Sequence, residues 1–329
     1  MDASEMLNGN AHENVSQKPD VAIVGELNPD LIVYGLPREL PEEREILANG
    51  FTLALGSSSA ILAHNLALLG SKVTFSSRIG GDVLGEMCRD RLREAGVEVD
   101  RVVRSTAGSN TGVTLILPLA TTRRILTYPG AMFEMGIEDL DLDYLARAKH
   151  FHLSSLFLHR KLSPHIPDLF IEMKQRGLTT SLDTNDDPED KWGGVLDRVL
   201  SLVDLLLCTE DELAKIAKTE NAAEHVAAKV PLLVVKRGAR GASAYTNGVR
   251  IDVPSLRVDV IDSVGAGDTF DAGFLHQWVR KAPLETCVAY GNLAGGLSVT
   301  RSGGTEAFSD SAYRQIFFER HWVHNTLVP

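Results

Sequence analysis

The sequence predicts an α/β protein built around a mostly parallel β-sheet, and three observations carry that prediction. Short β-branched runs alternate with longer amphipathic segments from Val21 onward, which is typical of strands joined by helical crossovers. The 329 residues are 44% hydrophobic, enough to bury one large core. Two regions break the alternation and contain strand-like runs with no helix between them. We therefore expect one main α/β domain with a small second sheet beside it.

The elements of the main domain follow in chain order from these two periods. Predicted strands cover residues 21–27, 72–80, 150–158, 179–185, 204–210 and 231–238, and predicted helices cover 59–70 and 82–96. The second helix has Cys88 on its apolar face, so we expect that thiol in the core rather than at a reactive site. A hairpin is predicted to turn at Asn247-Gly248, and the last helices follow Gly265 and Pro283.

The two irregular regions predict a small antiparallel sheet. Residues 30–37 and 51–56 give one pair of strands, and residues 112–119 and 123–130 give another. Strands without a crossover cannot join a parallel sheet, so antiparallel pairing is expected, and we interpret this sheet as a lid. Apolar residues alternate around Ile32 and Leu115 more than a small solvated sheet needs. This pattern predicts a homodimer joined through the lid.

Composition limits the partners and the compartment. The formal net charge of -11 argues against non-specific binding to nucleic acid or to a membrane surface, because both require clustered Lys and Arg. Three widely spaced cysteines without a CxxC pair predict a reducing, cytoplasmic location. No run approaches the roughly 18 apolar residues of a membrane span. Residues 1–20 are polar and are expected to form a disordered tail before a domain of residues 21–325.

The stretch DSVGAGDTF, residues 262–270, is predicted to turn from a strand at 258–261 into a helix. Glycines at such a turn expose backbone N–H groups at the positive end of the helix, where an anion can bind. Asp268, just beyond them, could accept a hydroxyl proton during phosphoryl transfer. Alternatively, Asp268 only caps the helix and the glycines only form a tight turn. A dinucleotide fingerprint is not indicated because its third glycine is missing, and no GxxxxGK[ST] loop occurs.

The same stretch, continued to Phe274, resembles the C-terminal signature of the PfkB (ribokinase-like) carbohydrate kinases, with Ser263 in place of the usual Thr. Other segments resemble the family in family order: GELNPD (25–30), RIGGDVLGEMCRDRLREAGV (78–97), TYPGA (127–131), SLDTNDDPEDKW (181–192) and LSVTRSGGTEAF (297–308). The resemblance implies a ribokinase-like three-layer fold, with the central sheet flanked by helices and the lid strands within about residues 30–56 and 111–131. It also implies a kinase that uses ATP and Mg²⁺.

The resemblance assigns roles on both sides of the reaction. Asp268 matches the catalytic base, and Gly265, Ala266 and Gly267 match the anion hole for the transferred phosphoryl group. Asp30 matches the ligand of the sugar hydroxyls, with Asn28 beside it, because a carboxylate can accept two hydrogen bonds at once. Without the resemblance, Asp30 would be interpreted as a turn residue at a strand end.

The sequence departs from the family at the sugar-binding GGxxxN motif, which reads GSSSAI over residues 56–61. Gly56 and Ser57 remain the expected substrate contacts, with the Ser57 hydroxyl as a substitute donor. Ile61 occupies the position of the usual Asn, so the sugar edge that Asn reads cannot be read in the same way. The identity of the sugar is therefore left open.

A second departure concerns CTEDE, residues 208–212, which resembles the family's N-x-x-E phosphate and magnesium motif. Thr209 stands in the Asn position, and Glu212 keeps the Glu position. Glu212 is expected to reach Mg²⁺ through water, since this ion retains much of its hydration shell. The alternative for Glu212 is a solvated charge in the first turn of a helix.

The remaining implied residues concern the nucleotide and a monovalent cation. VVKRGARGA, residues 234–242, resembles the strand and loop beside ATP, which puts Lys236 and Gly238 near the phosphates or the ribose. Lys236 could otherwise be a surface charge. Asn292 resembles the position that flanks the adenine, and Asp262 resembles a position near a monovalent-cation site, so K⁺ is a possible cofactor.

The sequence thus predicts an ATP-dependent kinase that phosphorylates a hydroxyl of a small sugar or sugar-like molecule. A nucleoside or a phosphorylated sugar is an alternative acceptor, and a basic cluster near the acceptor would favour the sugar phosphate. The departures at Ile61 and Thr209 leave open a sugar-binding regulator that has lost turnover. The histidines give no metal motif, and His150 and His152 are expected to be structural because they alternate along a strand.

Overall fold

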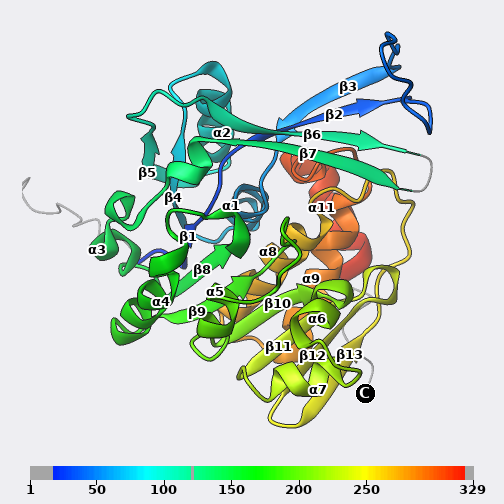
Figure 1. Ribbon diagram of the computed structural model, residues 1–329. Coiled ribbons are helices and arrows are strands. Elements are labelled where there is room, and N and C mark those ends of the chain that lie inside the picture. Colours follow the sequence, from blue (N-terminus) through cyan, green and yellow to red (C-terminus); the bar gives the residue numbers. More distant parts are fainter. Residues whose placement is uncertain (1–17, 120–121, 323–329) are drawn as a thin grey trace, which may run out of the picture.

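The computed structural model describes residues 18–119 and 122–322, and these residues form two sheets (Figure 1). The larger sheet is the middle layer of the main domain, between two layers of helices. The smaller sheet extends away from the main domain, at the upper right of the view. This arrangement confirms the predicted three-layer α/β fold with a separate lid.

The main sheet has nine strands within the described residues, in the order β13-β12-β11-β10-β9-β8-β1-β4-β5. Neighbours from β11 to β5 pair in parallel, and only β12 and β13 are antiparallel. The predicted hairpin turn is confirmed, with positive φ at both Asn247 and Gly248. The strands are β1 Val21–Val24, β4 Val73–Ile79, β5 Glu98–Arg104, β8 His150–Ser154, β9 Thr179–Asp183, β10 Leu205–Thr209, β11 Leu232–Lys236, β12 Ala242–Thr246 and β13 Val249–Val253.

Helices cover both faces of this sheet because its strands are apolar on both faces. On β10, Leu205 and Leu207 pack into one core and Leu206 and Cys208 into the other. The first core contains α1 Ser58–Leu68, α2 Val83–Glu94, α8 Ala266–Trp278 and α9 Leu284–Ser298. The second contains α3 Leu142–Leu145, α4 Ile166–Gln175, α5 Val195–Val199, α6 Glu210–Ala217 and α7 Ala222–Ala227. Helices α10 Glu306–Ser309 and α11 Ser311–Trp322 pack against α9.

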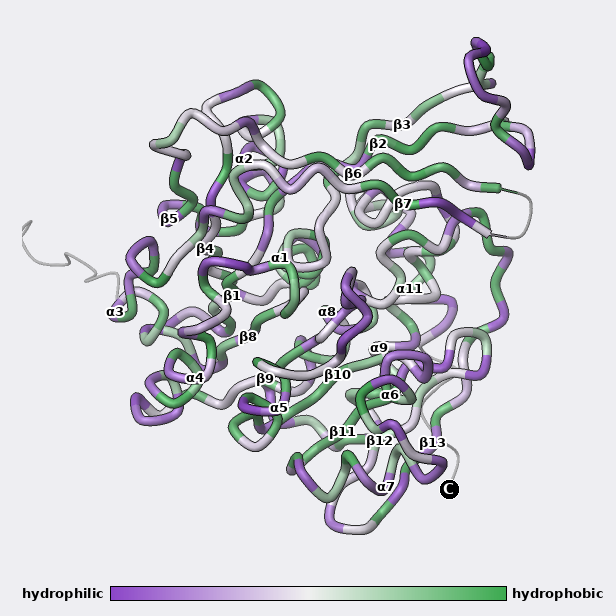
Figure 2. The backbone as a smooth tube through the Cα atoms, in the orientation of Figure 1, coloured by the Kyte–Doolittle hydropathy of each residue, from purple (hydrophilic) through white to green (hydrophobic). Residues whose placement is uncertain are grey.

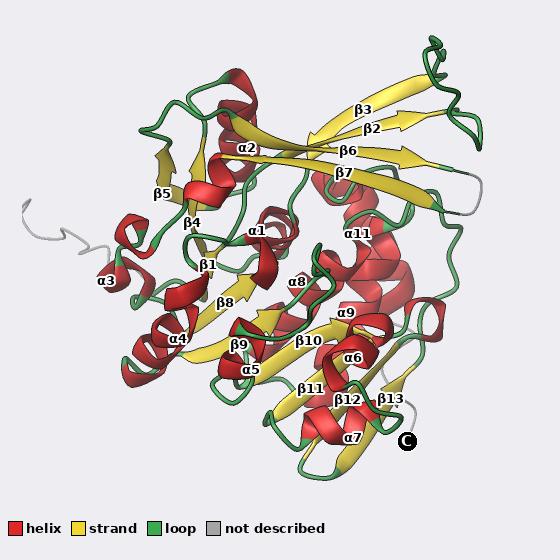
Figure 3. Cartoon of the chain, viewed as in Figure 1, coloured by secondary structure: helices red, strands yellow, loops and turns green. Residues whose placement is uncertain are grey.

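The lid consists of β2 Pro29–Tyr34, β3 Gly50–Leu55, β6 Thr111–Pro118 and β7 Arg123–Gly130. The predicted antiparallel pairs β2–β3 and β6–β7 are both present. The two pairs are joined by a parallel contact between β2 and β6, which the sequence did not predict. This contact is possible because the chain passes through α1, β4, α2 and β5 before β6 returns beside β2 (Figure 3).

The two faces of the lid differ in what they contact. Ile32 and Ile116 pack against Val264 of the main domain and are buried. Strand alternation turns the neighbouring residues to the outer face, where Phe51 is 71% and Leu126 is 53% exposed. Figure 2 shows hydrophobic colouring along much of the lid strands. Ile32 therefore belongs to the inner face, whereas Phe51 and Leu126 lie on the opposite face.

Two sequence expectations need correction or completion. Residues 258–261 are not a strand but part of a loop after β13, in which Val260 and Ile261 are exposed. Their apolar character resembled a strand, but the main-chain N–H of Ile261 donates to the carbonyl of Val299, just after α9, at 2.8 Å. Residues 1–17 of the expected tail lie outside the described residues. At its end, the main-chain N–H of Asp20 donates to the carbonyl of Lys72 at 2.8 Å.

Other expectations agree with the structure. Cys88 is fully buried, and burial raises the pKa of its thiol to about 12. His150 and His152 are buried and bonded to Ser181. None of the described helices is both long and apolar enough to cross a membrane. The short 3-10 helices are η1 Ala131–Glu134, η2 Ile137–Asp139, η3 Leu156–Leu158, η4 Ser163–His165 and η5 Gly238–Arg240.

Candidate active site

Polar residues gather at one edge of the main sheet, where its parallel strands end. Glu26 and Ser155 come just after β1 and β8, while Asp183, Thr209 and Lys236 are the last residues of β9, β10 and β11. Carboxyl ends of parallel strands meet at the same edge, which is where α/β sheets bind ligands. The N-terminus of α8 and the root of the lid reach this edge as well, so it is the candidate active site (Figure 3).

The glycine turn before α8 has a geometry that only glycine fits. Gly265 is the N-cap residue, with φ of +70° in the left-handed region. A Cβ at Gly265 would lie 2.7 Å from Cα of Gly304 and 3.1 Å from a methyl group of Ile61. Ala266 and Gly267 form the first turn of α8, where N–H groups lack partners from within the helix. The predicted anion hole therefore lies at a helix N-terminus, and the buried Ile61 packs against the glycine turn.

Asp268 lies in the first turn of α8 and is only 9% exposed. Burial raises the pKa of Asp268 to about 6, helped by the charge of Asp183 and opposed by Lys236 and by a hydrogen bond with the Ser58 hydroxyl. The N-cap residue is Gly265, and α8 has no side-chain cap. The capping interpretation of Asp268 is therefore wrong. A buried carboxylate with a pKa close to neutrality is suited to general-base catalysis.

Asp30 lies on β2 at the root of the lid and is 6% exposed. A Cβ at Gly56 would lie 2.1 Å from the Asp30 Oδ1 atom, so the glycine permits this close approach. Burial, followed by the charges of Asp268 and Glu26, raises the pKa of Asp30 to about 7. The charge of Asp268 raises the pKa of Asp30, and both carboxyl groups are buried, so the two acids lie in the same part of the site.

Asn28 and Ser57 connect the root of the lid to α1. The Ser57 hydroxyl accepts a hydrogen bond from the main-chain N–H of Asn28 at 2.9 Å, and Ser57 adopts a positive φ of 66°. The Asn28 side-chain amide donates to the sulfur of Met132 at 3.5 Å. Both predicted residues thus lie beside Asp30, but the Ser57 hydroxyl already bonds to the main chain.

Glu26 is a buried acid that the sequence analysis did not assign. Its carboxylate accepts from the hydroxyls of Ser59 and Ser155, both at 2.8 Å, and lies 3.8 Å from the His159 Nε2 atom. A Cβ at Gly25 would collide with the Ser59 hydroxyl at 1.8 Å, so that glycine is required. The sequence contained a sign that Glu26 belongs to the site, because Glu26 lies in the family-like segment GELNPD and its partner Ser59 belongs to a run of three serines.

On the nucleotide side, Thr209 and Glu212 form a reciprocal capping box at the start of α6. The Thr209 N–H donates to the Glu212 carboxylate at 2.7 Å, and the Glu212 N–H donates to the Thr209 hydroxyl at 3.3 Å. Glu212 is half-buried rather than solvated, and burial together with the charge of Asp183 raises its pKa. Thr209 pairs with Lys236 across β10 and β11. These three predicted residues are therefore neighbours.

Lys236 is buried rather than a surface charge. Its ammonium group donates to Asp183 at 2.7 Å and to Asp271 at 3.0 Å. Asp183 and Asp271 are 1% and 0% exposed, and neither was assigned from the sequence. Asp271 could have been noticed, because it follows Asp268 by three residues and so shares its helix face.

Gly238 and Asn292 lie farther along the predicted nucleotide path. Gly238 is exposed, has a positive φ of 56° and opens the turn after β11. The Asn292 side chain donates to the carbonyls of Val253 and Pro254 at 3.1 and 3.2 Å, which joins α9 to the end of β13. Within the described part of the chain, neither residue forms a hydrogen bond with Asp268.

Asp262 ties the loop before α8 to a later turn. Its carboxylate accepts from the N–H groups of Val264 and Gly303, both at 3.0 Å, and from the Ser302 hydroxyl at 3.2 Å. Ser302 also bonds to the hydroxyl of Tyr34 on the lid strand β2. Residues 18–119 and 122–322 contain no group of three or more His, Cys, Asp or Glu side chains that could hold a metal ion.

The GxDxxG segment lies at the root of the lid. Asp82 caps α2 by accepting from Gly85 at 3.0 Å, and it also accepts from the N–H of Thr111, the first residue of β6, at 2.7 Å. The Thr111 hydroxyl accepts in turn from the N–H of Gly80 at 2.9 Å. A side chain at Gly80 would collide with Thr111, since a Cβ would lie 2.3 Å from its nitrogen. The segment therefore fixes the point where the chain enters the lid.

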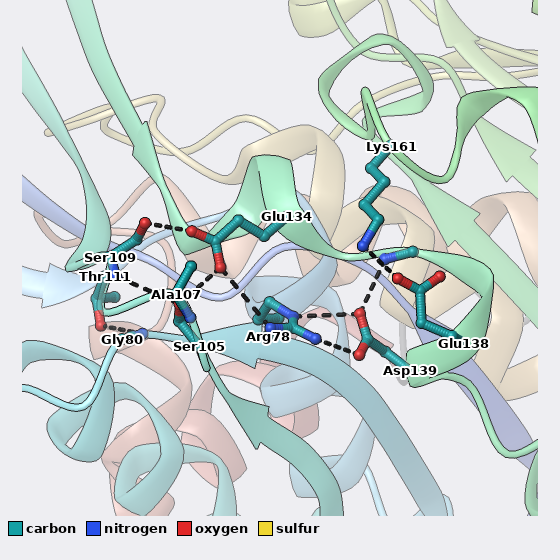
Figure 4. Close-up of polar contacts among 11 residues, drawn as sticks. Arg78, Gly80, Ser105, Ala107, Ser109, Thr111, Glu134, Glu138, Asp139 and Lys161 are labelled. Atoms are coloured by element: carbon teal, nitrogen blue, oxygen red, sulfur yellow. Dashed lines mark hydrogen bonds and ion pairs between the residues drawn. The ribbon is translucent and has the colours of Figure 1, made fainter.

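The point where the chain leaves the lid is fixed by Arg78 (Figure 4). The Arg78 guanidinium forms an ion pair with Asp139 and lies 3.7 Å from Glu134. Both acids belong to the short helices η1 and η2 that follow β7. Glu134 also accepts from Ser105, at 2.6 Å, on the chain segment that leads to β6. Arg78 thus connects the main sheet to both connections of the β6–β7 pair.

Comparison with known proteins gives consistent matches along the chain. The model of the pfkB family carbohydrate kinase matches residues 18–311. A 5-dehydro-2-deoxygluconokinase of Geobacillus kaustophilus is 25% identical over 324 residues, covering 93% of this chain and 95% of the relative. An ATP-dependent ribose-1-phosphate kinase of Halopiger xanaduensis is 28% identical over 271 residues, covering 80% and 87%. A putative ribokinase II from E. coli in complex with ATP and Mg²⁺ superposes with a TM-score of 0.81 at 23% identity, covering 92% of this chain and 100% of that chain.

Proposed function

The chain belongs to the pfkB family of carbohydrate kinases and is an ATP-dependent carbohydrate kinase, and from this premise we propose that Asp268 is its general base. Asp268 takes the proton of a sugar hydroxyl, whose oxygen forms a bond to the γ-phosphorus of ATP while the bond to the β-phosphate oxygen breaks and ADP leaves. The N–H groups of Gly265, Ala266 and Gly267 stabilise the charge on the transferred group. The observation that carries this proposal is a buried carboxylate, with a pKa of about 6, in the first turn of the helix whose N-terminus is the anion hole.

The acceptor sugar would bind at the root of the lid. Asp30 accepts hydrogen bonds from its hydroxyls, and Gly56 keeps the space that Asp30 needs. Asn28 and Ser57 hold this region in shape through their mutual hydrogen bond. Asp268 raises the pKa of Asp30, which supports their proximity, and this proximity would bring one hydroxyl to the base.

ATP would lie along the ends of β10 and β11. Thr209 and Gly238 would line the path of the phosphates and ribose, Lys236 lies beside Thr209 at the end of β11, and Asn292 would shape the adenine end. Bound Mg²⁺ neutralises charge on the phosphates, and the Glu212 carboxylate is an oxygen ligand of the kind this ion binds through water. Asp262 is the residue we assign to a K⁺ site, because it orients the loop that precedes the anion hole.

An acceptor screen tests the proposed function directly. ADP release would be measured with neutral sugars, sugar acids, sugar phosphates and nucleosides, each with Mg²⁺ and with excess chelator. We expect turnover with a sugar, loss of that turnover in chelator, and stimulation by K⁺. ATP binding without turnover on any acceptor would instead support a regulator.

A phosphorylated sugar is the second candidate acceptor, and Arg123 favours it. The register of the lid strands puts the side chains of Arg123, Thr127 and Asp30 on the same face of the lid. Its positive charge lowers the pKa of Asp30, against the effect of burial. If the acceptor carries a phosphate, Arg123→Met should reduce kcat/KM about tenfold more for the sugar phosphate than for the neutral sugar. Equal losses would remove this candidate.

The homodimer remains part of the proposal, with its contact on the outer face of the lid. Four residues of that face are large, apolar or aromatic, and more than a third exposed: Phe51, Leu53, Leu126 and Tyr128. Patches of this kind mark contact surfaces.

The net charge of -11 supports the absence of nucleic-acid and membrane partners. Three unpaired cysteines support a cytoplasmic location.

A further inference from the structure

A buried group of one cation and two acids lies under the candidate anion hole. Lys236 at the end of β11 bonds to Asp183 at the end of β9 and to Asp271 on α8, at 2.7 and 3.0 Å. The lysine is 9% exposed and the acids are 1% and 0% exposed. Burying charged groups is costly unless they are paired, so this arrangement needs an explanation beyond solvation.

The group lies beside the proposed catalytic turn at Gly267. A Cβ at Gly267 would lie 3.4 Å from the Lys236 Nζ atom, an ordinary van der Waals distance, so the ammonium group lies beside this glycine. Asp271 follows Gly267 by four residues and Asp268 by three, so it stands on the same face of α8. The lysine therefore supports the first turn of α8 from below.

The charges of the group are balanced within it. Burial and the neighbouring Asp183 hold the pKa of Asp271 well above its usual value. Burial would also raise the pKa of Asp183, but the attraction of Lys236 and hydrogen bonds lower it. The raised pKa of Asp271 favours its protonated form, and the lowered pKa of Asp183 favours the anion that pairs with Lys236. The Oδ1 atom of Asp271 has no hydrogen-bond partner among the described residues, which a neutral acid tolerates better than a carboxylate.

We propose that Lys236 is a positioning residue for phosphoryl transfer, whose ammonium group, held by Asp183 and Asp271, fixes Gly267 and the adjacent Asp268 instead of binding the phosphates of ATP. Two of its three N–H donors bond to carboxyl groups of the protein, and this commits most of its hydrogen-bonding capacity away from a ligand. A small shift of the first turn of α8 would displace both the base and the anion hole. This inference rests on the proposed role of Asp268.

Two variants separate positioning from direct phosphate binding. Lys236→Met combined with Asp183→Asn removes both charges and leaves a neutral group, so the protein should fold. We expect kcat to fall about 10- to 100-fold, as displaced reacting groups cause, with the Kd for ATP within threefold of the wild-type value. Lys236→Arg should also lower kcat, because the larger guanidinium should not fit beside Gly267. Arginine nevertheless binds phosphate well, so a phosphate-binding role would be kept in this variant.

The opposite results would overturn the inference. A Kd for ATP at least tenfold weaker in the double variant, or full kcat in Lys236→Arg, would make Lys236 a phosphate ligand. An unchanged kcat in the double variant would make the group purely structural. The Kd is measured without an acceptor, so this arm remains decisive even if the acceptor screen fails and the proposed function is rejected. Lys229→Met, an exposed lysine on the same domain, is the matched control and should change neither quantity.

Discussion

The proposed base, Asp268, can accept a proton only in its ionised form, and burial with the charge of Asp183 raises its pKa to about 6. We therefore expect kcat/KM to be constant at alkaline pH and to fall about tenfold per pH unit below about pH 6. Asp30, with a pKa of about 7, titrates nearby, so the measured limb belongs to the pair. A pH profile from 5 to 9 checks this, and a flat profile down to pH 5 would contradict the assignment.

Gly56 is the residue whose missing side chain matters most for the acceptor. In Gly56→Ala the new Cβ would lie 2.1 Å from Asp30 Oδ1 and 2.8 Å from its backbone nitrogen, so Asp30 must move. We expect kcat/KM for the acceptor to fall about 10- to 100-fold, with little change in the KM for ATP. Gly50→Ala at the other end of β3 is the control, since a Cβ there meets nothing within 4 Å. Equal kinetics of the two variants would remove Gly56 from the site.

Some residues of the candidate site could be predicted from the sequence and others could not. The roles expected for Gly265 and Asp30 come from short motifs that resemble those of the family. The bonding partners of Lys236 could not be predicted in this way, because Asp183 and Asp271 are 53 and 35 residues away and only the folded sheet brings them together. Ile61 is a similar case, since its packing against Gly265 and Gly304 depends on α1 lying beside α8.

Among the elements, the lid depends on the ion pairs at its root. Arg78 and Asp139 are about nine-tenths buried, and removing one member of such a pair leaves an unpaired buried charge. We expect Arg78→Met to lower the free energy of unfolding by about 3 kcal/mol and to raise the KM for the acceptor. Arg93→Met is the control, because the Arg93–Asp90 pair is more than half exposed and should change stability by less than about 1 kcal/mol. Denaturant unfolding curves of both variants decide between these outcomes.

Element prediction succeeded where the hydrophobic period was regular and failed where pairing depends on distant strands. The run at 205–209 is a buried parallel strand, as its continuous apolar residues indicate. Strand β5 was missed because it lies at the sheet edge and carries exposed charges. The run at 258–261 was wrongly predicted as a strand, since local composition cannot show whether a neighbour is available. The parallel contact between β2 and β6 likewise depends on the whole intervening chain.

For the whole molecule, the outer face of the lid predicts the state of assembly. Leu126→Asp puts a charge into the apolar outer face, where Leu126 is 53% exposed. We expect the wild-type protein to sediment as a dimer at micromolar concentration and Leu126→Asp to sediment as a monomer. Val249→Asp, at a site on β13 that is 56% exposed, is the control and should remain a dimer. A wild-type monomer would contradict the prediction.

The central claim is best tested in a variant that stays folded. The pKa of Asp268 is raised in the folded state, so the folded protein holds a proton that the unfolded chain releases, and Asp268 costs stability as the pH rises through about 6. Asp268→Asn removes that cost and should raise the free energy of unfolding at pH 8 by about 1–3 kcal/mol. A gain in stability would establish that any loss of activity comes from the chemistry.

The most direct measurement is the kcat of Asp268→Asn on the best acceptor, beside the Kd values for ATP and sugar. Asparagine keeps the size of the side chain but cannot accept the proton, so kcat should fall about a hundred- to ten-thousand-fold. Both Kd values should change less than threefold, because the lost interaction belongs to the transition state. A kcat within threefold of the wild-type value would contradict the assignment of Asp268 as the base.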